Sequence, residues 1–254
     1  MCLIVFAHQM DDQFSLLVAA NRDEFYDRPT AVADFWVDSP GLFAGRDQRA
    51  GGTWLGISRS GRFAAVTNFR DTQAQTAQEN ILSRGELPPD FLRSASSPEQ
   101  FLDDLLKRQH RYTGFNLLIG DRNSLWYFSN RESLPRQLKP GIYGLSNHLL
   151  DTPWPKLCLA RERMSKLINT EVAPEALLHT VSDRQTHEVD NPRVGFNSQM
   201  ESLLSAQFVV TETYGTRAST ALRVNRNGKA DLVEQNFVAG GLKSERRVFE
   251  ITLD

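Results

Sequence analysis

Pairs of apolar segments joined by short polar turns stand at both ends of the chain, and this pattern constrains the fold more than any other. The first pair covers residues 2–7 and 15–20, and the last covers 219–224 and 230–237. Strand-length segments separated by turn residues predict antiparallel hairpins. A further strand is expected at 248–253. Such ends build sheet without the helical crossovers that parallel strands need.

The middle of the chain mixes strands and helices. Strands are expected at 53–58, 62–69, 115–120, 124–128 and 141–146. A helix is predicted after Ser97, a typical N-cap, with Pro98 in its first turn and apolar residues at helical spacing. Two more are expected to begin near Pro155 and Pro174. Hairpins flanking a helical middle favour an α+β fold, a four-layer αββα sandwich in one domain over residues 1–254.

Composition narrows the classes of function. With 29 basic and 31 acidic residues, the formal net charge of -2 offers no general attraction for nucleic acid. No segment approaches the roughly 18 apolar residues of a membrane span, and the apolar start of the chain is too short for a secretory signal. A cytoplasmic location is expected. Residues 72–87 and 182–199 are polar and aperiodic, which predicts loops able to act as lids.

The two cysteines lie far apart in the sequence, so no disulfide scaffold is indicated. Removal of Met1 would leave a thiol and a free α-amine together on Cys2. The amine has a reference pKa of about 7.7 to 8.0 and can take the thiol proton, which makes Cys2 a candidate nucleophile. The alternative is a small apolar residue that starts a buried strand. Cys158, on a predicted apolar helix face, is expected to be inert core.

Several blocks of sequence resemble the NRDE family, in order and over nearly the whole chain. They are Met1-Cys2-Leu3-Ile4, Asn21-Arg22-Asp23-Glu24, Gly51-Gly52-Thr53-Trp54-Leu55-Gly56, Ala64-Ala65-Val66-Thr67-Asn68, Tyr143-Gly144-Leu145-Ser146-Asn147 and Tyr214-Gly215-Thr216-Arg217. That family is itself similar to N-terminal-nucleophile (Ntn) hydrolases of the choloylglycine and penicillin V acylase type. The resemblance implies an Ntn-type αββα fold.

The resemblance also implies a set of catalytic residues. Cys2 would be the nucleophile, and Asp23, expected just beyond the second strand, would hold its α-amine. Asn68 and Asn147 would polarise the scissile carbonyl, because an amide donates hydrogen bonds without carrying a charge. Arg217 would lower the thiol pKa.

One position departs from the hydrolase pattern. Hydrolases of this group carry an arginine three residues before the aspartate, where this chain has Ala20. The nearest arginine is Arg22, which either faces the pocket or forms an ion pair with a neighbouring carboxylate. In a regular strand, Asn21 and Asp23 face one way while Arg22 and Glu24 face the other, which is compatible with a structural role for Arg22. Because the arginine of the hydrolase pattern is absent at Ala20, binding without hydrolysis stays open. The further residues expected at the pocket are Asn21, Arg22, Trp54 and His148.

Two other motifs have plainer interpretations. The run Gly51-Gly52-Thr53-Trp54 lacks the Lys-Ser/Thr and the following helix of a phosphate-binding loop, so a structural turn that leads into a strand is favoured. The five histidines show no paired spacing typical of a zinc site, and no metal site is expected.

The family resemblance implies haem handling as the first function: binding haem and transferring it to haemoprotein acceptors, with haem as a transported ligand and no cofactor required. It also implies links to acyl-lipid metabolism and, in animal members, to secretion and Golgi organisation. The second function is that of a cysteine Ntn hydrolase, an amidohydrolase or thioesterase acting on an acyl lipid or acyl-CoA through Cys2. A trafficking adaptor ranks third.

Overall fold

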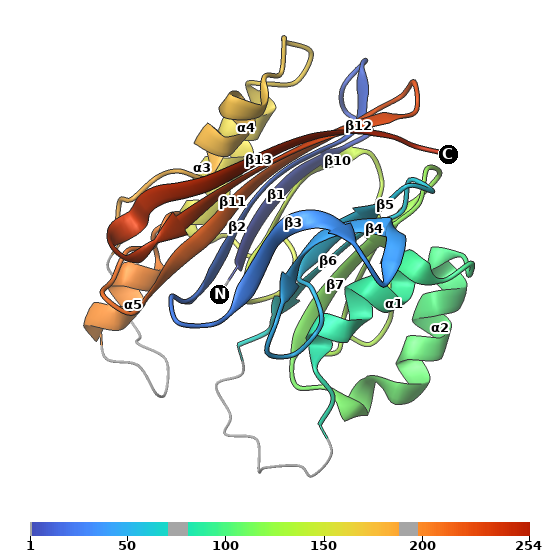
Figure 1. Cartoon of the computed structure of the whole chain (residues 1–254), viewed down its shortest axis with the longest axis horizontal. Coiled ribbons are helices and arrows are strands. Elements are labelled where there is room, and N and C mark those ends of the chain that lie inside the picture. Colours follow the sequence, from blue (N-terminus) through green and yellow to red (C-terminus); the bar gives the residue numbers. More distant parts are fainter. Residues whose placement is uncertain (1, 71–80, 188–197) are drawn as a thin grey trace.

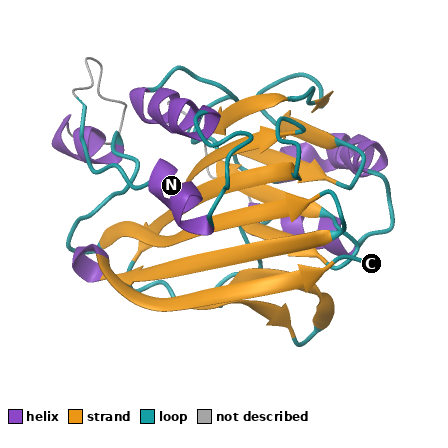
Figure 2. Ribbon diagram, turned by 90° about the horizontal axis from the view of Figure 1, so that it is seen from above, coloured by secondary structure: helices purple, strands orange, loops and turns teal. Residues whose placement is uncertain are grey.

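The computed structural model describes residues 2–70, 81–187 and 198–254. Its strands form two antiparallel sheets. The six-stranded sheet has the order β10-β1-β2-β11-β12-β13, with bounds Gly141–Leu145, Cys2–His8, Phe14–Phe25, Tyr214–Asn225, Lys229–Val238 and Leu242–Thr252. The seven-stranded sheet has the order β3-β4-β5-β6-β7-β8-β9, with bounds Thr30–Trp36, Ser39–Asp47, Leu55–Ser58, Phe63–Asn68, Phe115–Gly120, Leu125–Ser129 and Arg136–Gln137. The long strands of the first sheet run side by side in Figure 2.

Helices cover the outer face of each sheet. The α-helices are α1 (Leu87–Arg93), α2 (Pro98–Arg108), α3 (Pro155–Ser165), α4 (Pro174–Thr180) and α5 (Ser198–Leu204), and three single 3₁₀ turns are η1 (Arg84–Glu86), η2 (Gln109–Arg111) and η3 (Ala239–Gly241). Buried side chains of α1 and α2 pack on the seven-stranded sheet, and those of α3 and α4 pack on the six-stranded sheet (Figure 1). The layers are helix, sheet, sheet, helix, which confirms the predicted αββα sandwich.

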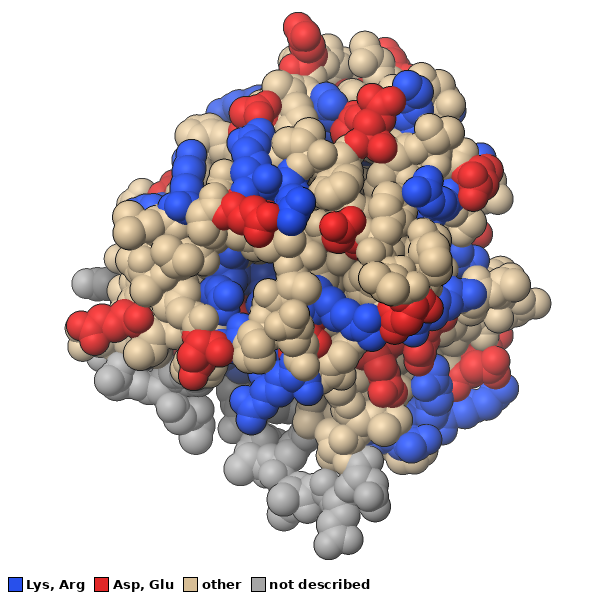
Figure 3. All heavy atoms as spheres, in the orientation of Figure 1, with Lys and Arg blue, Asp and Glu red and all other residues tan. Residues whose placement is uncertain are grey.

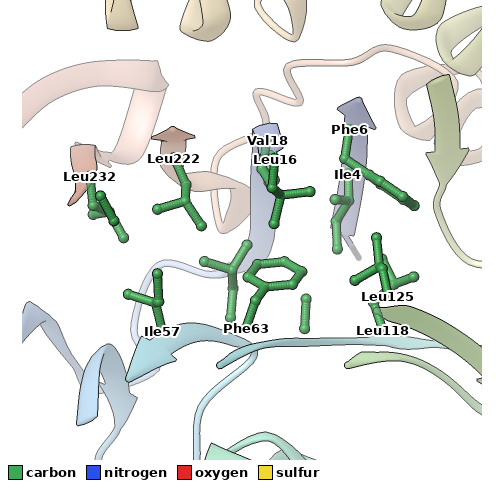
Figure 4. Close-up of a cluster of buried hydrophobic side chains, with 14 of the residues drawn as sticks. Ile4, Phe6, Leu16, Val18, Ile57, Phe63, Leu118, Leu125, Leu222 and Leu232 are labelled. Atoms are coloured by element: carbon green, nitrogen blue, oxygen red, sulfur yellow. The ribbon is translucent and has the colours of Figure 1, made fainter. Parts of the chain in front are cut away.

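The alternation of side chains along β1 explains how the sheets stack. Ile4 and Phe6 point into the space between the sheets, whereas Leu3 and Val5 belong to the cluster beneath α3 and α4. Figure 4 shows side chains of both sheets meeting in this central core. Because successive residues of a strand face opposite sides, Cys2 lies on the same inner face as Ile4.

Several predicted elements are confirmed. The hairpin β1–β2 has the expected connection, and α2 begins with a complete capping box in which the Gln100 N–H donates to Ser97 Oγ and the Ser97 N–H donates to Gln100 Oε1. The turn at Gly51-Gly52-Thr53-Trp54 leads into β5 as expected. Strands β3 and β4 and helix α1 were not predicted from the sequence.

Two predictions were wrong. Strand β2 continues to Phe25, so Asp23 lies inside the strand and not beyond it, because the pairing with β11 extends past Ala20 to Phe25. Cys158 is exposed on α3. The buried face of that helix is instead formed by Leu157, Ala160 and Met164, with the aliphatic stem of Lys156 beside them.

The two predicted loops lie partly outside the described residues, at 71–80 and 188–197. Within the described parts, the first ends in η1 and α1, and the second leads into α5. Of the helices in residues 2–70, 81–187 and 198–254, none has the length and apolar character needed to cross a bilayer.

Candidate functional site

Cys2 is the first residue of β1 and lies directly opposite Arg22 of β2 in the antiparallel ladder. Directly opposed residues share one face of a sheet and hold their Cβ atoms about 4.5–5.5 Å apart. Both side chains line a cavity of about 490 Å³ that opens between the sheets. The volume falls in the usual range for small-molecule pockets, about 300–1,000 Å³.

The cavity walls combine charged and apolar side chains. Its charged lining residues are Arg22, Asp23, Glu24, Arg28, Asp47, Arg84, Arg217, Glu234 and Glu245. Its apolar lining side chains include Val32, Trp54, Val66, Leu82 and Phe237. Basic side chains lie in a hollow of the face shown in Figure 3, near the position that Figure 1 marks as the N-terminus. A ligand with both a charged group and an apolar part fits such walls.

Burial and nearby charges act in opposite directions on the Cys2 thiol. Burial raises its pKa, since a thiolate is poorly solvated away from water, and the Asp23 carboxylate acts in the same direction. The guanidinium groups of Arg22 and Arg84 lower that pKa. Arg217, the expected cation, lines the same cavity, and its effect on the thiol stays a prediction.

Asp23 reaches the cavity beside Cys2 and is itself buried. The Thr216 hydroxyl donates to Asp23 Oδ1 over 2.7 Å, which fixes the carboxylate. Burial raises the pKa of Asp23, while the ammonium group of Lys156 and the hydrogen bond from Thr216 lower it. Lys156 is buried at the start of α3, where its Nζ donates to the Leu204 carbonyl. A carboxylate in this place is suited to holding an α-amine at residue 2.

A β-bulge brings Arg217 to the cavity wall. The register between β2 and β11 shifts between Thr216 and Ala218, which leaves Arg217 without a partner in the ladder. Its Nη1 donates to the carbonyl groups of Phe25, Tyr26 and Arg28 over 2.8, 3.0 and 3.1 Å. Arg217 therefore closes the β2–β3 turn over one side of the cavity.

Asn68 and Asn147 are neighbours, but the structure brings only one of them to the cavity lining. Asn68 ends β6 and lines the cavity, whereas Asn147 lies fully buried behind it and donates from Nδ2 to the Asn68 carbonyl over 2.9 Å. The adjacent Ser146 hydroxyl donates to the Cys2 carbonyl over 2.8 Å. The Asn147–Asn68 bond connects the end of β10 to β6 of the other sheet, and the Ser146–Cys2 bond ties the same end of β10 to β1 next to the thiol. The oxyanion roles of both amides stay predictions.

The remaining predicted pocket residues divide evenly. Arg22 and Trp54 line the cavity. Asn21 does not, because it points to the outer face of the sheet, where its Nδ2 donates to the Val181 and Gln207 carbonyls. The His148 ring lies between Phe69 and Trp154, with centroids 5.0 and 6.1 Å away, and is likewise outside the lining.

Arg22 combines the two roles considered for it. Besides facing the cavity, its Nη2 lies 3.6 Å from Glu24 and 3.7 Å from Asp47. Arg28 bonds to the same Asp47 over 2.7 Å. Two of the cavity arginines thus have carboxylate partners within the protein.

Two residues that line the cavity were missed from the sequence. Glu234 of β12 is buried at the cavity, and its Oε1 accepts from the Ala33 N–H and from Asn236 Nδ2. Burial raises its pKa. Arg84 comes from η1 and is 62 residues away from Arg22 in the chain. Neither has a local signal, because only the folded chain brings these strands and turns to one cavity.

Main-chain contacts hold the Arg84 segment in place. The Thr53 N–H donates to the Gly85 carbonyl and the Leu82 N–H to the Arg111 carbonyl, both over 2.9 Å. Gly52 lies so close to Gly85 that a Cβ at residue 52 would overlap the Gly85 backbone. Glycine is therefore needed at residue 52, because a side chain there would prevent the two main chains from approaching this closely.

Within the described residues there is no group of three or more His, Cys, Asp or Glu side chains placed to hold a metal ion. The chemistry available at the cavity is that of a thiol, carboxylates, guanidinium groups and amides.

Comparison with known proteins places the chain in a family. The model of the family described as Transport and Golgi organisation 2 matches residues 1–239. The chain belongs to this family. Its relatives include the Transport and Golgi organization 2 homolog of Mus musculus, 34% identical and covering 100% of this chain and 99% of the relative. The Transport and Golgi organization protein 2 of Drosophila melanogaster is 25% identical and covers 93% and 92%.

Solved structures similar to this family member establish the fold class. Penicillin V acylase from Agrobacterium tumefaciens superimposes with a TM-score of 0.55 at 11% identity, covering 100% of this chain and 86% of the acylase. The mutant C2A of the conjugated bile acid hydrolase from Clostridium perfringens gives 0.56 at 9% identity, covering 100% and 93%. The Caenorhabditis elegans N-acylethanolamine-hydrolyzing acid amidase ortholog gives 0.51 at 12%, covering 87% and 92%. The predicted Ntn-type fold is confirmed.

Proposed function

We propose that the cavity at Cys2 binds acyl compounds and hydrolyses an amide or thioester bond in them. The observation that carries this proposal is the placement of the Cys2 thiol on the inner face of β1, opposite Arg22 and open to a cavity of about 490 Å³. A thiol that faces a mixed charged and apolar pocket is suited to attack on a bound acyl carbon.

The reaction follows from the groups present. After removal of Met1, the α-amine of Cys2 takes the thiol proton and Sγ bonds to the acyl carbon. The C–N or C–S bond then breaks, and the proton passes to the departing amine or thiol. Water releases the acyl group as a carboxylic acid and restores the thiol. Asp23, held by Thr216, would orient the α-amine. Arg22 and Arg84 favour the thiolate.

The structural relatives agree with this proposal without deciding it. Three solved structures with this fold are named as an acylase, a bile acid hydrolase and an acid amidase. Their identity to this chain is low, so the likeness concerns the fold. The support from the chain itself is the position of Cys2, Asp23 and Asn68 around one cavity.

Haem handling is the second candidate, and one observation favours it. Among the described residues that line the cavity, Cys2 is the single side chain of a kind that ligates haem iron. A thiol whose pKa burial raises would be a weak ligand, as a carrier that releases its cargo requires. We place this candidate second because charged side chains surround the thiol, whereas a flat macrocycle needs broad apolar walls. A cytoplasmic location is part of either proposal.

The deciding experiment compares the wild-type protein with Cys2→Ala. Both are tested for turnover of N-acyl amides and acyl thioesters and for haem binding by absorbance titration, after intact-mass measurement has established removal of Met1. Turnover that Cys2→Ala abolishes supports hydrolysis. Haem binding that needs Cys2, without turnover of any acyl substrate, would replace hydrolysis by the second candidate.

A further inference from the structure

Four arginines line the cavity, and they differ in what their guanidinium groups contact. Arg22 and Arg28 lie beside Glu24 and Asp47. Arg217 donates to three backbone carbonyl groups of the β2–β3 turn. The charge or hydrogen-bonding capacity of these three is thus used within the protein.

Arg84 is different. Its Nη1 donates to the neutral hydroxyl of Thr113 over 2.9 Å, and within residues 2–70, 81–187 and 198–254 no carboxylate lies within 4.0 Å of it. A guanidinium group has five N–H donors, so this single bond leaves most of them available. Burial lowers the pKa of Arg84, which reflects the cost of withdrawing a cation from water, and the charges of Cys2 and Glu24 act in the opposite direction.

The position of Arg84 is fixed rather than adaptable. Its segment is tied to η2 through Leu82 and to the turn before β5 through Gly85, and Thr113 holds one end of the guanidinium group. The side chain faces the same cavity as Cys2 and Thr113. A guanidinium group that is held in place, and that has no carboxylate within 4.0 Å in the described part of the chain, is suited to bidentate binding of a carboxylate, phosphate or sulfonate.

We infer that Arg84 binds an anionic group of the ligand, so that the acyl compounds accepted here carry a carboxylate, phosphate or sulfonate close to the bond at Cys2. This inference rests on the proposed function for the acyl part of the ligand. It adds a specificity-determining residue and a substrate class: anionic acyl conjugates in preference to neutral ones.

The test uses two compounds with the same acyl chain and amide, N-decanoylglycine, which ends in a carboxylate, and N-decanoylethanolamine, which ends in a neutral hydroxyl. Binding of each is measured by calorimetry to Cys2→Ala, which cannot turn them over, and to Cys2→Ala/Arg84→Gln. A charged hydrogen-bonded pair is expected to give about 10- to 100-fold tighter binding of the glycine conjugate. This preference should fall below about threefold without Arg84.

Two controls make the result specific. Arg46→Gln, in the same Cys2→Ala background, removes an exposed arginine that pairs with Asp38, and it should leave the preference unchanged. Arg84→Lys keeps the charge but loses the planar pair of donors, and it should retain part of the preference. Circular dichroism of each variant establishes that it is folded.

The outcomes separate this inference from the hydrolytic proposal. Equal binding of the two compounds, a preference that persists in the Arg84→Gln variant, or no binding of either compound would overturn the inference. If the wild-type protein shows no turnover while the Arg84-dependent preference is present, the hydrolytic proposal is rejected and the anionic ligand class is supported. Turnover by the wild-type protein without an Arg84-dependent preference would support hydrolysis and overturn the anionic ligand class.

Discussion

Cys2 and Arg22 form a directly opposed pair across the β1–β2 ladder, with both side chains at the cavity between the sheets. The arginine of this pair occupies the strand position two residues after Ala20, where the hydrolase pattern would have an arginine. A cation is therefore still supplied to the thiol, from the facing residue. Hydrolysis remains chemically reasonable despite the departure from the pattern.

Replacement of Arg22 should slow the reaction of the Cys2 thiol with alkylating reagents. In a Cys158→Ser background, which removes the exposed second thiol, Arg22→Met is expected to raise the pKa of Cys2 further and to move the pH dependence of its alkylation by iodoacetamide to higher pH. Arg217→Met is the matched control and should leave that profile in place. A shifted profile in Arg217→Met together with an unchanged profile in Arg22→Met would mean that Arg217 is the cation beside the thiol.

Loss of Asn147 should weaken the connection between the sheets. Asn147→Ala leaves the partly buried Asn68 carbonyl without this donor, and we expect a loss of about 1–3 kcal/mol in the free energy of unfolding, measured with urea. Asn123→Ala, at an exposed turn, should change stability by less than about 0.5 kcal/mol. An Asn147→Ala protein as stable as the wild type would show that this bond contributes nothing.

A methyl group at residue 52 should disturb the site through the backbone. Gly52→Ala forces the Gly52 and Gly85 main chains apart, and we expect about 1–3 kcal/mol of destabilisation, with an altered rate of Cys2 alkylation because the Arg84 segment moves. Gly41 has open space around its Cα, so Gly41→Ala serves as the control. Equal thermal unfolding midpoints for the two variants would contradict the predicted overlap.

Glu234 should make stability depend on pH. Burial raises its pKa in the folded protein, so the folded state binds the proton more tightly than the unfolded state does, and stability falls as pH rises from the ordinary glutamate range through the folded-state pKa. Glu234→Gln should flatten this fall when unfolding is measured between pH 4 and pH 8. The pKa of Glu250 is lowered by the hydrogen bond from Lys229, so its contribution to stability increases as pH rises through the glutamate range. Glu250→Gln should remove this increase.

The sequence predicted the sandwich because hairpins and amphipathic helices are local patterns. It failed at β3 and β4, where register shifts between Ala31 and Asp34 and between Phe35 and Trp36 interrupt regular alternation. It also failed at α1, where Pro88 and Pro89 look like helix breakers but lie in the first turn, which tolerates a missing N–H.

Within the site, strand alternation correctly separated Arg22 from Asn21, but the cavity lies on the side of Arg22, whereas Asn21 points to the outer face. Arg84 and Glu234 were beyond prediction, since their placement depends on contacts between distant segments. His148 follows Asn147 in sequence, yet aromatic packing against Phe69 and Trp154 turns it away. Adjacency along the chain did not translate into adjacency at the cavity.

The bulge at Arg217 sets the cavity wall against the regularity of the sheet. Without this extra residue the ladder between β2 and β11 would pair without interruption from Tyr214 to Val224, which would favour stability. The irregularity places a guanidinium group over the β2–β3 turn at the cavity edge. A deletion variant lacking residue 217 is therefore expected to stay folded but to have an impaired pocket. In this strand, the residue that serves the pocket is one that regular pairing does not need.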